Sequence, residues 1–180
     1  MHMNVKPSAI AVLASLLLDA CAPYQVFSPQ IMEGVDPDFD FARWRMVPNT
    51  MTDRKVRLGG RIVQAETREN GVVIVVAQLP IVEHPAYGPK DIGKRGGEFV
   101  VTYQGKVGQN ALQPGNRLIV VGTTQNAKVV VLEDFQRSLP SIDGRCLHIW
   151  NTGGRDIEDF PSYGAGYEPL EEDTYCARAR

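Results

Sequence analysis

The chain has 180 residues, 43% of them hydrophobic, and a formal net charge of −2 at pH 7. That length suits one domain with a single hydrophobic core. The nearly balanced charge argues against a surface built to bind a polyanion.

The first twenty residues have the layout of an export signal. A short segment with one lysine, Lys6, precedes an apolar run over residues 9–18. This order predicts a signal peptide over residues 1–20. The run is about half the roughly 20 apolar residues that a membrane-spanning helix needs, so we do not expect it to span a membrane. A short buried helix at the start of a cytosolic domain is the alternative.

The signal segment ends in a motif similar to the lipobox of bacterial lipoproteins. Leu18, Ala20 and Cys21 match it, and Asp19 stands where these proteins usually carry a small neutral residue. The similarity implies cleavage before Cys21, followed by attachment of a diacylglycerol thioether and an N-acyl chain such as palmitate. Two acyl chains suffice for stable anchoring. Because Ala22 rather than aspartate follows, the resemblance favours outer membrane lipid as the partner of Cys21.

Residues 21–50 are rich in proline and acidic side chains, which predicts a linker from the anchor to the folded domain. The alternating carboxylates Asp36, Asp38 and Asp40 lack the glycine and distal glutamate of an EF-hand, so we expect a solvated turn before a short helix. Four apolar side chains are expected to dock this segment onto the domain: Phe39, Phe41, Trp44 and Met46.

The next stretch is basic, with only Asp53 opposing its positive charges. We expect a solvated face here, and contact with anionic lipid head groups is the alternative. The basic residues are Arg43, Arg45, Arg54, Lys55, Arg57 and Arg61.

Apolar runs from residue 56 onward predict five β-strands. Gly59 and Gly60 interrupt the first and predict a bulge or sharp bend. Asn70 and Gly71 are the pair favoured in a type I′ hairpin turn, and another turn is expected over residues 123–128. The predicted strands cover residues 56–62, 72–77, 98–103, 117–122 and 129–132.

Five strands with a glycine-bent first strand predict an all-β fold, a small five-stranded OB-like Greek-key barrel. An open β-sandwich is the competing architecture. The chain then divides into a signal peptide (1–20), a linker (21–50), the barrel domain (51–150) and an acidic tail (151–180).

The tail has seven carboxylates and no basic residue between positions 156 and 173. This composition buries little apolar surface, so we expect an irregular, partly disordered segment. Its aromatic pair, Tyr163 and Tyr167, is expected to lie against the barrel.

Three cysteines leave one sulfur unexplained in an exported protein, and lipidation of Cys21 accounts for it. Cys146 and Cys176 are then expected to form a disulfide, which an oxidising periplasm permits. It would close a loop of about thirty residues, worth about 3 to 4 kcal/mol in the loop-closure model. Two unpaired cysteines, one of them buried, are the alternative.

The lipobox is followed by several short segments in a characteristic order, at residues 56–62, 77–81, 97–100, 115–122 and 147–150. In this order they resemble the Slp family of outer membrane lipoproteins, over residues 18 to 150. Members of that family are associated with starvation and the cell envelope. The resemblance implies a lipid-anchored protein of the outer membrane that faces the periplasm, and it implies no particular chemistry.

We find no motif for catalysis or for a cofactor in the sequence. No His, Cys and Asp cluster has zinc-ligand spacing, and neither a Gly-x-Ser-x-Gly elbow nor a P-loop occurs. We therefore expect no cofactor, no metal and no catalytic residue, in a lipoprotein that binds or braces an envelope component. OB-type barrels often bind single-stranded nucleic acid, but export and the acidic balance argue against that partner here.

Two other functions remain open at this point. The first is a periplasmic binding module for saccharide or lipid head groups, using Phe99 and Tyr103 or the basic stretch. The second is a thiol-dependent periplasmic enzyme in which His148 and Asp143 assist a Cys146 nucleophile. The expected disulfide uses the same sulfur.

Overall fold

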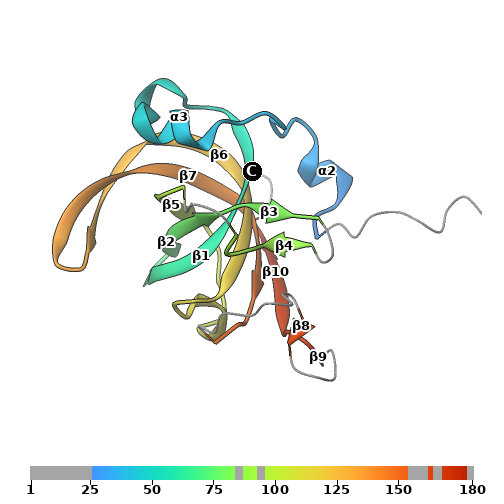
Figure 1. Ribbon diagram of the computed structural model, residues 1–180. Coiled ribbons are helices and arrows are strands. Elements are labelled where there is room, and N and C mark those ends of the chain that lie inside the picture. The colour runs from blue at the N-terminus through green and yellow to red at the C-terminus, as the bar shows by residue number, and fades with distance from the viewer. Residues whose placement is uncertain (1–25, 84–86, 93–95, 154–161, 164–167, 178–180) are drawn as a thin grey trace, which may run out of the picture.

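The computed structural model of the protein describes residues 26–83, 87–92, 96–153, 162–163 and 168–177. Most of its strands form one barrel, with two short helices on the same side (Figure 1). The barrel strands are β1 (Lys55–Arg68), β2 (Gly71–Leu79), β5 (Glu98–Tyr103), β6 (Arg117–Leu132) and β7 (Phe135–Trp150). The shorter strands are β3 (Ile81–Val82), β4 (Gly88–Pro89), β8 (Ser162–Tyr163), β9 (Glu168–Pro169) and β10 (Glu172–Cys176). The helices are α2 (Pro29–Met32), α3 (Phe41–Met46) and the 3₁₀ turns η2 (Pro48–Thr50) and η3 (Asn110–Leu112).

The five barrel strands pair in a closed ring. β1 is antiparallel to both β2 and β6, and β5 is antiparallel to β2 but parallel to β7. The antiparallel β6–β7 hairpin completes the ring. Five strands in this Greek-key order make an OB-type barrel. The predicted all-β, OB-like fold class is therefore confirmed.

Strand β1 is shared between two neighbours, and its glycines make this possible. Gly59 and Gly60 pair with β2 on one side and with β6 on the other. A Cβ on Gly60 would lie 2.4 Å from the carbonyl oxygen of Ala77. The glycines therefore allow close approach of backbones. Of the predicted bulge or sharp bend, the bulge is not at these glycines, because the register shift of β1 against β2 falls between Ile62 and Gln64.

The β1–β2 hairpin was predicted correctly, but its turn was not. Arg68 pairs with Gly71, so the turn residues are Glu69 and Asn70, one position earlier than expected. Neither residue has a positive φ, which a type I′ turn would require at both positions. Gly71 instead opens β2 with a φ of 153°.

The last two barrel strands differ most from the prediction. Residues 117–122 and 129–132 belong to one strand, β6, and the expected turn at 123–128 contains only a register irregularity. The missed fifth strand is β7, which pairs with β6 along a hairpin that extends from the barrel as an arm (Figure 1). Residues 135–138 of β7 are all exposed, so this part of the strand lacks the alternating pattern of a half-buried strand. Its turn is formed by Glu133 and Asp134, whose φ values are 50° and 66°.

The barrel interior follows the alternation of the strands. Val72, Ile74 and Val76 of β2 belong to the core, together with Phe99 and Val101 of β5. Successive residues on a strand point to opposite faces, so the residues between them lie on the outer face.

The segment before β1 packs against the barrel and contributes to its core. Asp40 caps α3 by accepting a hydrogen bond from the Arg43 backbone at 3.0 Å. Trp44 is fully buried, and Phe39 and Phe41 pack beside it as expected. Met46 was expected to pack too, but it is 73% exposed. Two residues along a helix turn by about 200°, so Met46 faces away from Trp44.

The tail also contributes a barrel neighbour that the sequence analysis missed. Strand β10 runs antiparallel to β7, from Glu172 opposite Trp150 to Cys176 opposite Cys146. Residues 164–167 lie outside the described part of the chain, so the expected position of Tyr163 and Tyr167 remains a prediction.

Candidate functional site

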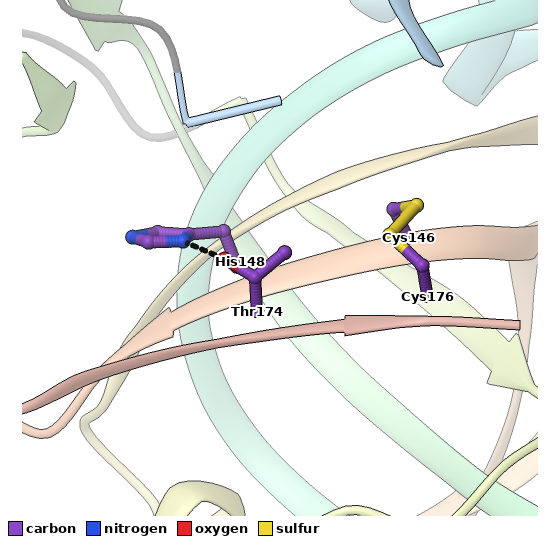
Figure 2. Close-up of a disulfide and its surroundings, with 4 residues drawn as sticks. All are labelled: Cys146, His148, Thr174 and Cys176. Carbon is purple, nitrogen blue, oxygen red and sulfur yellow. Dashed lines mark hydrogen bonds between the residues drawn. A yellow bond between two sulfur atoms is a disulfide. The ribbon is translucent and has the colours of Figure 1, made fainter. Parts of the chain in front are cut away.

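A disulfide joins the barrel strand β7 to β10, the strand that pairs with it outside the ring. Cys146 of β7 and Cys176 of β10 are cross-strand neighbours, with Cα atoms 4.2 Å apart and an S–S bond of 2.04 Å (Figure 2). Cys146 is fully buried, and Cys176 is exposed. Both sulfurs are used in this bond, so neither is available as the thiolate that a nucleophilic mechanism requires.

His148 lies two residues beyond Cys146 on the same face of β7 and is held by polar and aromatic neighbours. Its Nδ1 shares a 2.7 Å hydrogen bond with the Thr174 hydroxyl of β10 (Figure 2), and its Nε2 lies 3.5 Å from the Glu172 carboxylate. The Trp150 ring packs edge-on against the imidazole of His148, with ring centroids 4.2 Å apart. Phe27, from the N-terminal segment, also packs edge-on against this imidazole. His148 therefore joins β7, β10 and residues before the barrel.

Burial lowers the pKa of His148 below its ordinary value of 6.5, although Glu172 and Asp173 oppose the shift. The unfolded chain therefore takes up a proton at a higher pH than the folded chain. We expect the free energy of unfolding to be highest above pH 6.5 and to fall as the pH drops through the lowered pKa of the folded state. Urea titrations between pH 7.5 and 5 will measure this. A His148→Gln variant should lose that part of the pH dependence, and an unchanged profile would contradict the assignment.

A groove of about 490 Å³ lies between η3, the end of β7 and the strand β10. Tyr175 spans part of it, with its hydroxyl donating to Asp173 at 3.2 Å. Burial raises the pKa of Tyr175, so its hydroxyl stays protonated at neutral pH. Ile149 also lines the groove, but its side chain is almost fully buried in the core. The polar lining residues are Gln109, Asn110, Asn151, Glu171, Asp173 and Tyr175.

A fully buried amide, Asn116, holds two sides of this groove together. Its Nδ2 donates to the carbonyl oxygens of Asn110 and Ala111 at 2.9 and 3.1 Å, which fixes η3. Its Oδ1 accepts from the backbone N–H groups of Thr152 and Gly153 at 3.0 and 3.2 Å, which fixes the end of β7. The role of Asn116 could not be predicted from the sequence, because its partners lie up to 37 positions away. Its position after Gly115 signalled only a turn.

A second groove of about 350 Å³ lies where α3 meets the base of the arm. Arg45 lines it and packs over Gly97, where a Cβ would come within 2.7 Å of the arginine side chain. Arg137 lines the other side and forms a 3.2 Å ion pair with Glu98. This groove is mixed in charge.

Three residues of the basic stretch make contacts within the chain. Arg54 pairs with Asp36 at 2.6 Å, Arg57 donates to the Tyr87 hydroxyl at 3.1 Å, and Lys55 donates to the Glu33 carbonyl. These residues fasten different parts of the chain to β1. The structure therefore gives this stretch a role in packing the N-terminal segment and the loop after β3.

The outer face of β2 and β5 is the face that OB folds use for oligonucleotides and oligosaccharides. Here it bears Val73, Val75 and Val100, all of them buried. Phe99 and Tyr103, one of the two contact sets considered for the alternative binding function, are also buried because alternation turns them into the core. They therefore cannot serve as ligand contacts, and the β2–β5 face offers no exposed aromatic stacking platform in the described chain.

Among the described residues, no group of three or more His, Cys, Asp or Glu side chains is placed to hold a metal ion. The same part of the chain includes no helix that is both long and apolar enough to span a membrane. Cys21 and the signal segment lie outside the described residues, so lipidation of Cys21 remains a prediction.

Comparisons with known proteins identify a family model and a solved structure that are similar to this chain. The crystal structure of a small single-stranded DNA-binding protein from Streptomyces coelicolor is 17% identical, covers 53% of this chain and 92% of its own, and has a TM-score of 0.36. No curated protein matches the chain. A family model described as "Outer membrane lipoprotein Slp family" matches residues 18–175. That match takes in the lipobox, the whole barrel and nearly all of β10. The chain therefore belongs to the Slp family of outer membrane lipoproteins.

Proposed function

We propose that the mature protein begins at Cys21, carries lipid on that residue and is anchored in the outer membrane with its barrel facing the periplasm. The observation that carries this proposal is the family match from residue 18, which includes Leu18, Ala20 and Cys21. The bond between Cys146 and Cys176 suits an oxidising compartment.

The short stretch of chain between Cys21 and the folded residues supports a barrel held close to the lipid surface. Val26, five residues after Cys21, already packs against the cluster around Phe27 and Trp150. Five extended residues span at most about 18 Å. The anchor would therefore hold the barrel beside the membrane, with no long flexible spacer between them.

Within this location the protein acts as a structural or binding component. Both described cysteines form a disulfide, and no metal-binding group is present in the described chain. The thiol-enzyme alternative therefore has no nucleophile among these residues. A binding role is favoured by one specific feature, the groove beside β10.

The anchor is tested by metabolic labelling with radioactive palmitate. We expect the wild-type protein to incorporate label and to fractionate with outer membranes, and a Cys21→Ser variant to incorporate none. Cys176→Ser is the matched control, because it removes a cysteine that is not expected to be acylated. Equal labelling of wild type and Cys21→Ser would refute the proposal.

A further inference from the structure

We propose that the groove between η3 and β10 binds an oligosaccharide that is neutral or carries amino groups. This deepens the binding role given above and rests on the proposed envelope location, where such glycans are accessible. The groove volume of about 490 Å³ falls within the range of roughly 300 to 1,000 Å³ typical of small-ligand sites.

The chemistry of the lining selects hydroxyl-rich ligands. Gln109, Asn110 and Asn151 present side-chain amides, each with two donors and an acceptor oxygen. Glu171 and Asp173 present carboxylates, which accept hydrogen bonds from hydroxyl or ammonium groups. Neighbouring hydroxyls of a sugar ring match such mixed donors and acceptors.

The charge of the groove selects against acidic ligands. Its lining includes two carboxylates and neither lysine nor arginine. An anionic sugar would bring like charges together, and an amino sugar would bring opposite ones. A phosphate or carboxylate ligand is therefore disfavoured here, in contrast to the mixed groove lined by Arg45 and Arg137.

The groove is built by contacts that hold its walls before any ligand arrives. Asn116 fixes η3 to the end of β7 through four hydrogen bonds. The disulfide fixes β10, which carries Asp173 and Tyr175, against β7. A site whose walls are already ordered loses less conformational entropy on binding. This gives the disulfide a role in ligand binding as well as in stability.

The test is calorimetric titration of the purified full-length protein in detergent with three trisaccharides. They are a trimer of N-acetylglucosamine, a trimer of glucosamine and a trimer of galacturonic acid. We expect the first two to bind, the glucosamine trimer more tightly at low salt, and the acidic trimer to give no heat of binding. Equal binding of all three, or binding of none, would overturn the proposal. Binding of trilysine without binding of any sugar would also overturn it, in favour of a basic peptide.

Two isosteric variants locate the site. Glu171→Gln and Asp173→Asn should each weaken binding of the glucosamine trimer by about tenfold or more, the equivalent of one charge-assisted hydrogen bond. Glu66→Gln, an exposed carboxylate on β1 outside the groove, should leave the affinity unchanged. Circular dichroism of each variant will show that the fold is retained.

Unchanged affinity in both groove variants would place any binding elsewhere. Because these titrations do not depend on acylation, their failure is distinguishable from failure of the Cys21 proposal.

Discussion

Replacing Cys176 with serine is expected to lower the free energy of unfolding by about 3 to 4 kcal/mol. The disulfide joins residues 30 positions apart, and without it the unfolded chain regains the freedom that the closed loop removes. Cys176 is the better cysteine to replace, because it is exposed whereas Cys146 is fully buried. The serine therefore leaves no cavity, and the loss reports on the cross-link.

Urea denaturation monitored by tryptophan fluorescence measures this effect, since Trp150 lies opposite Glu172 at the other end of β10. A reducing agent should lower the stability of the wild type to that of Cys176→Ser, and it should not change the variant further. A loss below about 1 kcal/mol in both comparisons would mean that the cross-link does not restrain the unfolded chain as the loop-closure model requires.

Replacing Trp44 with alanine is expected to cost about 3 to 5 kcal/mol, the range for truncating a large aromatic side chain in a core. The Trp44 ring is fully buried and packs against the rings of Phe39, Phe41 and Phe99 at centroid distances of 5.5, 5.7 and 6.4 Å. Phe99 belongs to β5, so Trp44 couples the segment before the barrel to the barrel itself. The variant should lose the order of residues 39–46 together with stability.

Met46→Ala is the matched control, because it truncates a large apolar residue of the same helix that is exposed. Its stability should stay within about 0.5 kcal/mol of the wild type. Both variants are compared by urea denaturation, and hydrogen exchange of α3 reports the local effect. If Trp44→Ala cost no more than Met46→Ala, residues 26–50 would behave as the free linker that their composition suggests.

The features that could be predicted from the sequence are those that local pattern encodes. Apolar alternation located the four strands that begin near residues 56, 72, 98 and 117, because each has one face in the core. A short helix was expected after the acidic turn that ends at Asp40, and α3 begins at the next residue. The odd number of cysteines led to the expected pairing of Cys146 with Cys176, which are directly opposite in the structure.

Other features depend on contacts that no short stretch of sequence records. The arm of β7 is exposed to solvent over residues 135–138, so pairing with β6 decides its conformation. β10 lies in an acidic segment and is a strand because β7 offers it an edge. The groove needs η3, β7 and β10 together, and Asn116 joins two of them across more than 30 residues. Its lining residues are therefore visible only in the folded chain.

The most direct test of the account is the mass of the N-terminal peptide from protein extracted out of the outer membrane. We predict a chain that begins at Cys21 and carries a diacylglycerol group and an N-linked acyl chain on that residue. A peptide that still contains residues 1–20, or one that begins at an unmodified Cys21, would contradict the proposed anchor.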